Sequence, residues 1–506
     1  MKNRSLLIGE QSLLVQCGNA LLDQAFSVDA VIARNPIIVD WARDKGIACF
    51  VSEREWLATK GEQDSQPFDY LFSITNLRVL SKEILAVPTR MAINFHDGPL
   101  PKYAGLNTPV WALLAGEQEY GISWHVMASD VDAGDILKQQ FFPVVPGETV
   151  FTLNAKCYQA GLDSFTELIT ELANDTLSRQ KQNADDLHVF FKKDRPDSAA
   201  VIDWRKSSKE ILRLVQALDF GGYANPLCQA KILTTNGPLL FASVELVNKS
   251  GGQPGEIIEL TEDSLCISTS DGCLQFLGLT CLQGYPIDSK SLDLEIGVVL
   301  SSLESSDSEA INTHFSTVAN REGLWIERFQ AYQALPAPFI STREQAAGDT
   351  STYARSEDQD LVKVLAQCNE HWRQLNAGDS SGVERLVTAL SVVFSRLNRE
   401  QYASFLSLHI PDVSSLCYTG GLFNGLMPIN IDIGEDAPTV SDLENTVTKE
   451  LAPILSNPGY ASDIFARNPE LRGQQYRSDL LLQITNTLNL RSVDAAAYRQ
   501  GKAKLV

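Results

Sequence analysis

Short apolar runs alternate with amphipathic stretches along the first part of the chain. Residues 5–8, 28–33, 47–51, 70–74 and 92–95 are strand-like runs, whereas residues 11–25, 38–45, 108–115 and 149–173 have the spacing of helices. A regular alternation of strands and helices is typical of an α/β domain with a largely parallel sheet. The pattern therefore predicts a doubly wound α/β domain over residues 1–190.

The pattern changes twice further along the chain. A polar stretch at 175–186 predicts a linker, after which a helix at 207–218 and short runs at 239–246, 255–260, 265–269 and 273–279 predict a small β-barrel over residues 191–300. A second polar stretch at 301–309 predicts another boundary. Beyond it, helices at 361–368, 383–397 and 440–455 and strands at 402–409 and 426–433 predict a third α/β domain over residues 310–506.

Composition narrows the class of protein. A chain of 506 residues is too long for one hydrophobic core. Its 63 Asp and Glu against 42 Lys and Arg give a net charge of -21, which opposes binding to nucleic acid. No run approaches the roughly 20 apolar residues that span a bilayer. The nine cysteines are scattered without a Cys-x-x-Cys pair, which favours reduced thiols over disulfides or structural zinc. We therefore expect a cytoplasmic protein that uses no metal.

Two short segments carry the candidate chemistry. Asn94 and His96 lie at i and i+2 near the end of a predicted strand, so their side chains project from the same face. A loop rich in proline and glycine follows, and ligands often sit at the carboxyl ends of strands in open α/β sheets. A second strand then leads into an acidic turn that contains Asp132 and Gly134. Asn94, His96 and Asp132 are therefore the candidate catalytic residues.

These residue types suit acyl transfer to an amine. A histidine beside a carboxylate can take the amine proton, and an asparagine amide can stabilise the oxyanion of a tetrahedral intermediate. Each residue taken alone also has a structural explanation, since an isolated Asn-x-His is more often a hydrogen-bonded turn. His125 is expected to be a packed strand residue. Lys102 and Tyr103 are candidate substrate contacts, with a plain loop role left open.

The combined motif resembles that of folate-dependent N-formyltransferases, which share Asn-x-His, a Leu-Pro-x-Tyr-x-Gly loop and Asp-x-Gly-Asp. Asn94-Phe-His96, Leu100-Pro-Lys-Tyr-Ala-Gly105 and Asp132-Ala-Gly-Asp135 match this order and spacing. The resemblance implies a Rossmann-like domain that uses 10-formyltetrahydrofolate as formyl donor. It implies that Asn94 stabilises the oxyanion, that His96 is the acid and base, and that Asp132 favours the protonated histidine.

The same resemblance implies where the pterin of the folate binds. Two loops would enclose it, and their residues are Arg78, Val79 and Leu80 in one loop and Ala128, Ser129, Asp130, Val131 and Asp132 in the other. One departure concerns the position just after the Tyr-x-Gly loop. Some amino-sugar formyltransferases carry an arginine there, whereas this chain has Leu106-Asn107, so any contact by that arginine has no counterpart.

The later regions carry further resemblances. Val201-Ile-Asp-Trp204, Phe220-Gly-Gly-Tyr223 and Pro254-Gly-Glu-Ile257 are similar to the C-terminal barrel of two-domain formyltransferases. The third region is similar to the C-terminal half of nonribosomal peptide synthetase condensation domains, for example at Gly420-Gly-Leu-Phe-Asn-Gly-Leu-Met-Pro-Ile-Asn-Ile431. That family needs adjacent histidines, and none of the six histidines here are adjacent. The third region is therefore expected to be non-catalytic.

The sequence leaves the amine acceptor open. The favoured hypothesis is formylation of an amino acid, or of an aminoacyl group bound to a carrier protein, in nonribosomal peptide assembly. The alternatives are a nucleotide-linked amino-sugar formyltransferase, methionyl-tRNA, which the acidic balance disfavours, and a non-catalytic scaffold of a synthetase. We expect no nucleic-acid and no membrane partner, and a synthetase partner or a homodimer contact through the third region.

Overall fold

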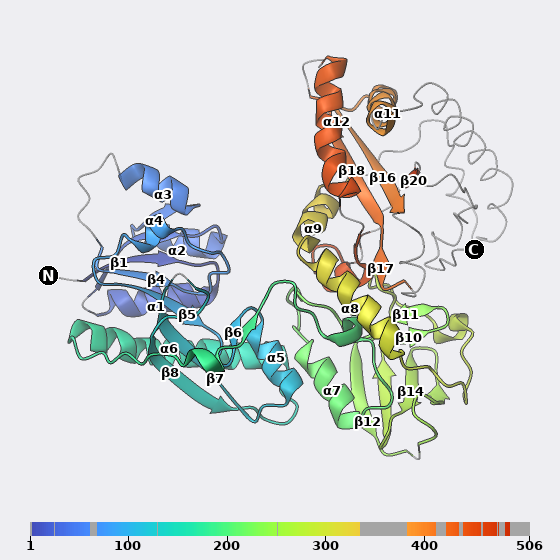
Figure 1. Cartoon of the computed structure of the whole chain (residues 1–506), viewed down its shortest axis with the longest axis horizontal. Helices are drawn as coiled ribbons and strands as arrows, with labels where there is room; N and C mark the ends of the chain where they lie inside the picture. The colour runs from blue at the N-terminus through green and yellow to red at the C-terminus, as the bar shows by residue number, and fades with distance from the viewer. Residues whose placement is uncertain are drawn as a thin grey trace. The chain divides into compact units, whose positions relative to one another are not determined.

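A computed structural model describes most of the chain. It covers residues 3–24, 26–60, 68–128, 130–249, 251–333, 382–410, 421–434, 439–456, 459–472, 474 and 481–485. The chain divides into two compact units (Figure 1). Unit 1 contains Met1–Lys192 and Arg213–Gly221, and unit 2 contains Lys193–Leu212 and Gly222–Val506. Among the described residues, no helix is both long and apolar enough to cross a bilayer.

Unit 1 is built on a seven-stranded mixed sheet with the order β3-β2-β1-β4-β5-β7-β8. Its strands are β1 (Asn3–Ile8), β2 (Phe26–Ile32), β3 (Ala48–Phe50), β4 (Tyr70–Ser73), β5 (Met91–His96), β7 (Glu119–Val126) and β8 (Ile136–Pro143). The first five strands run parallel, whereas β7 is antiparallel to both β5 and β8. This is the predicted Rossmann-like α/β fold, and the antiparallel edge brings the end of β7 back to β5.

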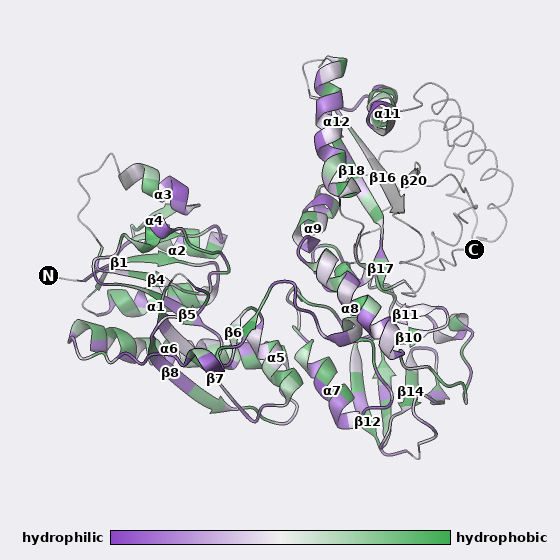
Figure 2. Cartoon of the chain, in the orientation of Figure 1, coloured by the Kyte–Doolittle hydropathy of each residue, from purple (hydrophilic) through white to green (hydrophobic). Residues whose placement is uncertain are grey.

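Helices cover both faces of this sheet. One face is covered by α1 (Ser12–Leu22), α2 (Pro36–Asp44) and α6 (Val150–Ala173), and the other by α3 (Glu53–Lys60) and α4 (Lys82–Leu85). The strands between them are largely apolar (Figure 2), as expected when both faces of a parallel sheet are buried. Helix α6 begins with a capping box, in which the Thr149 and Thr152 side chains each bond to the other's backbone N–H. Helix α5 (Thr108–Ala115) follows the short strand β6 (Ala104–Gly105).

The segment after α6 differs from its prediction as a linker. Gln180 forms a β-bridge with Ile136, and β9 (Val189–Phe190) pairs in parallel with β6. A short 3₁₀ helix, η1 (Ala184–Asp186), lies between them. Polar composition predicted a linker, but the segment forms backbone hydrogen bonds with β8 and with the loop that follows β5. We call residues 180–190 the return segment.

Helix α7 (Ser208–Ala217) begins in unit 2 and continues into the stretch Arg213–Gly221, which belongs to unit 1. The first part of unit 2 also contains two small sheets. Strands β12 (Ser243–Val247), β15 (Cys273–Leu277), β14 (Ser264–Ser268) and β13 (Ile257–Leu260) form an antiparallel sheet in that order, and β10 (Ile232–Thr234) pairs with β11 (Gly237–Leu239). Trp204 is buried in the apolar core that these strands share. The predicted strands are present, except that the run at 239–246 is divided between β11 and β12, and the predicted small β-barrel is not confirmed.

The rest of unit 2 contains a second core. Its helices are α8 (Ser305–Ala319), α9 (Glu322–Ala331), α11 (Gly382–Asn398) and α12 (Val440–Leu455). Strands β18 (Leu426–Asp432), β16 (Tyr402–Ile410) and β20 (Leu481–Thr485) form one sheet, and β17 (Phe423–Asn424) pairs with β19 (Tyr460–Ala461). Helix α8 begins inside the stretch that was predicted as a boundary. The predicted helix at 361–368 lies outside the described residues.

A buried ionic cluster joins these two parts of unit 2. Lys231 and Asp463 form an ion pair of 2.6 Å, and the Arg467 Nε donates to the other oxygen of Asp463 over 3.0 Å. Arg467 also pairs with Glu322, which in turn pairs with Arg195 over 3.0 Å. The side chains of Lys231, Asp463 and Arg467 are at most 1% exposed. Buried ion pairs therefore cross the predicted boundary between the second and third domains, and each charge in them is compensated by its partner.

Candidate functional site

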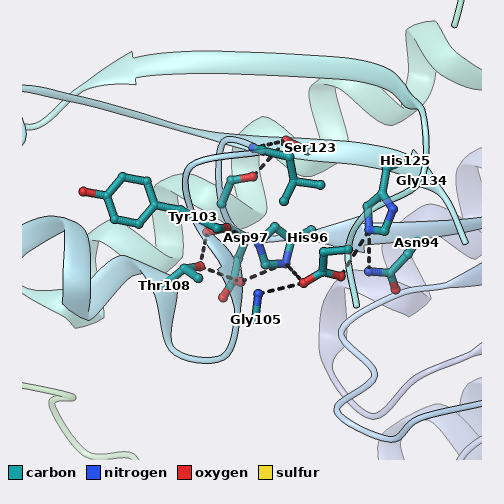
Figure 3. Close-up of polar contacts among 12 residues, drawn as sticks. Asn94, His96, Asp97, Tyr103, Gly105, Thr108, Ser123, His125 and Gly134 are labelled. Atoms are coloured by element: carbon teal, nitrogen blue, oxygen red, sulfur yellow. Dashed lines mark hydrogen bonds and ion pairs between the residues drawn. The ribbon is translucent and has the colours of Figure 1, made fainter. Parts of the chain in front are cut away.

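Neighbouring strands place four polar side chains on one face of the sheet in unit 1. Asn94 and His96 lie two residues apart on β5, so their side chains share one face. The antiparallel register places His125 of β7 opposite Asn94 and Ser123 opposite His96. Directly opposite residues in such a pair have their side chains on the same face, within contact distance. Figure 3 shows the Asn94 and His125 side chains facing each other from these two strands, with the His96 ring beside them.

Asp132 lies between the two histidines. One carboxylate oxygen is 3.5 Å from His96 Nδ1, and the other is 3.4 Å from His125 Nε2. Burial raises the pKa of the Asp132 carboxyl, but the His96 charge, the His125 contact and the hydrogen bond from the Gly105 N–H together lower it well below its usual range. Asp132 is therefore ionised at neutral pH. The structure brings the three predicted residues Asn94, His96 and Asp132 together.

His125 contacts the Asn94 side chain and a carbonyl of its own strand. Its Nε2 is 3.1 Å from the Asn94 side-chain nitrogen, and its Nδ1 is 3.0 Å from the Val126 carbonyl oxygen. If Nδ1 carries the proton and donates to that carbonyl, Nε2 can accept a hydrogen bond from Asn94. The prediction of His125 as a packed strand residue holds for its burial, at 2% exposed, but it omits these contacts. Its spacing seven residues before Asp132 gave no signal of a contact.

The His96 ring is fixed by the loop that follows its strand. Its Nε2 is 2.5 Å from the Tyr103 carbonyl oxygen, so this nitrogen is the donor. Its Nδ1 then faces Asp132 and, at 3.9 Å, a carboxylate oxygen of Asp97. Loss of water contact raises the pKa of the Asp97 carboxyl, even though the nearby His96 charge lowers it. Asp97 is a further site residue that the sequence analysis did not assign.

Two glycines allow the loops of the site to approach closely. The Gly105 N–H donates to Asp132 over 2.8 Å, and Gly105 has a φ of +93°, which favours glycine. Gly134 lies against β7, where an added Cβ would be 1.8 Å from the Val126 carbonyl oxygen. The motif glycines are therefore explained by backbone conformation at one position and by close packing at the other.

Replacing Gly134 with alanine is expected to move the Asp132 turn away from β7, because the new Cβ would overlap the Val126 oxygen. Misplacing a reacting group by about 1 Å can lower turnover on the order of a hundredfold. Turnover and thermal unfolding should be measured for Gly134→Ala beside Gly222→Ala, where no atom lies within 4 Å of the added Cβ. Equal turnover in both variants would contradict this account of the turn.

The predicted folate-binding residues occupy two loops of unit 1. Val79 and Val131 are exposed, whereas the Leu80 side chain packs into the apolar core. The Arg78 guanidinium is 3.3 Å from a Glu10 oxygen. Ala128 and Asp130 lie in the turn before Asp132, and Ser129 lies outside the described residues. Folate binding by these residues stays a prediction.

The predicted substrate contacts Lys102 and Tyr103 are both tied to Glu117. The Lys102 ammonium is 2.5 Å and the Tyr103 hydroxyl 2.8 Å from the same Glu117 oxygen. Tyr103 is buried and stacks on Phe190 of the return segment with a centroid distance of 6.0 Å. The Tyr103 side chain therefore supports the loop, while Lys102 is mostly exposed. Among the described residues, no group of His, Cys, Asp and Glu is placed to hold a metal ion.

Two parts of the chain match models of known protein families. Residues 23–169 match the family model described as formyl transferase, and residues 197–292 match the formyl transferase C-terminal domain. These matches support the formyltransferase family. Asn94, His96 and Asp132 all lie within the first matched range.

Individual relatives match only part of the chain. The chain is 31% identical over 190 residues to methionyl-tRNA formyltransferase of Lactococcus lactis subsp. lactis, which is 37% of this chain and 57% of that protein. The chain thus spans little more than half the length of this relative. An N-formyltransferase from Helicobacter canadensis was solved with folinic acid and dTDP-3-aminofucose. It is 21% identical to this chain, and the TM-score of the superposition is 0.44. The match covers 55% of this chain and 100% of the chain from Helicobacter canadensis. HypX from Aquifex aeolicus, solved with tetrahydrofolic acid, is 18% identical with a TM-score of 0.40 over 55% and 44%.

Proposed function

We propose that the chain is an N-formyltransferase that moves the formyl group of 10-formyltetrahydrofolate to a primary amine. The observation that carries the proposal is the placement of the Asp132 carboxylate between His96 and His125, with Asn94 beside His125. The family-model match over the same residues supports this reading. The donor is a co-substrate, and the chemistry needs no metal and no nucleophilic serine or cysteine.

His96 accounts for proton transfer in the proposed reaction. In the neutral ring that donates from Nε2 to the Tyr103 carbonyl, Nδ1 carries no proton and can accept that of the attacking amine. The amine nitrogen bonds to the formyl carbon, the bond from that carbon to the folate nitrogen breaks, and the His96 proton passes to the leaving nitrogen. The Asp132 carboxylate stabilises the imidazolium during this sequence.

Asn94 accounts for the oxyanion of the tetrahedral intermediate. Its amide nitrogen carries two N–H groups, so one can donate to His125 while the other donates to the oxyanion. His125 holds the amide in this orientation, which makes it a positioning residue. The proposed roles of Asn94, His96 and Asp132 are those that the motif predicts, and His125 is an addition to them.

For the acceptor, we propose an amino acid or a carrier-bound aminoacyl group in nonribosomal peptide assembly. The resemblance of the third region to half of a condensation domain supports this context. The net charge of -21 disfavours tRNA as the alternative acceptor. In this proposal the third region is a non-catalytic docking part for a synthetase partner. It is structurally continuous with the second region through the ionic cluster.

An acceptor panel tests the proposal. Purified protein and 10-formyltetrahydrofolate should be incubated separately with free amino acids, aminoacyl N-acetylcysteamine thioesters, an aminoacyl carrier protein, dTDP-3-aminofucose and methionyl-tRNA. Tetrahydrofolate release and mass spectrometry of the formylated amine are the readouts. We expect formylation of the amino-acid or aminoacyl substrates. Formylation of the sugar or tRNA alone would overturn the acceptor, and folate binding without any formylation would overturn the enzyme.

A further inference from the structure

The return segment contacts both catalytic loops of unit 1. The Ile136 and Gln180 backbones exchange hydrogen bonds of 2.8 and 2.9 Å just after the Asp132 turn. Further along, the His188 N–H donates to the Pro101 carbonyl over 3.2 Å, and the Ala104 N–H donates to the His188 carbonyl over 3.0 Å. The segment therefore lies against the turn that carries Asp132 and the loop that fixes His96.

Gln182 makes the side-chain contact between this segment and the Asp132 turn. Its amide nitrogen donates to the Asp132 carbonyl and to the Gly134 carbonyl, each over 2.6 Å. Both neighbours are acceptors, so the nitrogen and not the oxygen of the amide must face them. The Gln182 side-chain oxygen is buried without a hydrogen-bond partner among the described residues. An unsatisfied buried oxygen costs free energy, so the two donated bonds have to offset that cost.

The backbone of Asp132 needs such support. Its φ is +51°, in the left-handed region that residues other than glycine rarely occupy. A residue keeps such a conformation when its surroundings determine it from several sides. The carboxylate accepts a hydrogen bond from the Gly105 N–H and lies within 3.5 Å of ring nitrogens of His96 and His125, but these contacts involve only the side chain. Gln182 fixes the carbonyls on both sides of Ala133 and hence the orientation of the turn.

We infer that Gln182 is a positioning residue that holds the Asp132 carboxylate in place between His96 and His125. It touches no reacting atom and acts through the backbone of the turn. This inference rests on the role proposed above for Asp132 in formyl transfer, but the geometry it describes can be tested without any acceptor.

Amide hydrogen exchange in full-length Gln182→Met tests the geometry. Methionine has a similar length and donates no hydrogen bond, so the turn would lose both contacts. The informative amide is Gly105, which donates to the Asp132 carboxylate and lies far from Gln182 in sequence. We expect faster exchange at Gly105 in Gln182→Met and no change in Gln180→Ala, whose exposed side chain is removed while its backbone pairing remains. Unchanged exchange at Gly105, or faster exchange throughout unit 1, would overturn the inference.

A kinetic measurement separates positioning from general stability. With the best acceptor of the panel, Gln182→Met should lower kcat about tenfold to a hundredfold while the thermal unfolding temperature is unchanged. Gln182→Glu should be equally impaired at pH 8, where a carboxylate donates nothing, and should regain activity relative to wild type as the pH falls toward 5.5 and the carboxyl becomes a donor. A loss in Gln182→Glu that does not depend on pH would overturn the positioning role. A panel without any formylation would overturn the proposed function and leave the Gly105 result to decide the geometry.

Discussion

Replacing His96 with alanine, or Asp132 with asparagine, is expected to lower turnover at least about a hundredfold, the usual contribution of an acid or base group. His96→Ala removes the nitrogen that accepts the amine proton in the proposed mechanism. Asp132→Asn keeps the shape but removes the charge that lies 3.5 Å from that nitrogen. Initial rates of tetrahydrofolate release at saturating donor, with tetrahydrofolate binding measured in parallel, separate loss of chemistry from loss of binding.

A matched control and the pH profile sharpen this prediction. Asp40→Asn removes an exposed carboxylate elsewhere in unit 1 and should leave turnover unchanged. The pKa of Asp132 is depressed, so its carboxylate is charged above that low value and becomes neutral only as the pH falls through it. A decline in wild-type activity between pH 8 and about 5 would therefore come from a group other than Asp132. Turnover of His96→Ala within about tenfold of wild type would remove the proposed mechanism.

The sequence predicted strands β1 to β5 and helices α1, α2, α5 and α6 of unit 1 because the central sheet is buried on both faces, but it did not predict β8, α3 or α4. Apolar runs that are flanked by amphipathic helices can form few other structures, and the two-residue period placed Asn94 and His96 on one face. Periodicity gave no prediction of packing for polar segments that form hydrogen bonds with the backbone of other loops. The return segment has no apolar pattern, so its contact with Asp132 through Gln182 was not predictable from periodicity.

The start of helix α8 was predicted as a domain boundary for a related reason. Its first turn contains Ser305, Ser306 and Asp307, which are common both in linkers and at helix amino termini. The apolar residues Ile311, Phe315 and Val318 follow at helical spacing and become buried in unit 2. His125 and Asp97 are a different case, because their roles depend on the pairing register of β5 with β7 and on the path of the loop. Neither is a property of a short sequence segment.

Replacing Asp463 with asparagine is expected to destabilise unit 2 by about 3–5 kcal/mol, the usual cost of leaving a buried charge without its partner. Asp463 is fully buried and faces two cations, Lys231 at 2.6 Å and Arg467 at 3.0 Å. The other Lys231 contacts are the Ala199 and Gln229 carbonyls, which cannot neutralise its charge. Urea unfolding of the full-length variant, beside Glu259→Gln, measures the effect. Glu259 belongs to a partly exposed ion pair, so its loss should cost less than about 1 kcal/mol.

The pH dependence of this difference identifies its cause. Burial raises the pKa of Asp463, but the charges of Lys231 and Arg467 outweigh burial and lower it to about 2. A depressed pKa gives stability that is fully present above the unfolded pKa and is lost as the pH falls through the folded one. The gap between wild type and Asp463→Asn should thus be largest near neutral pH and narrow from about pH 4 downward. A gap that stays constant between pH 7 and 3 would assign the loss to packing, and a small gap at pH 7 would show that the second and third regions do not depend on this ion pair.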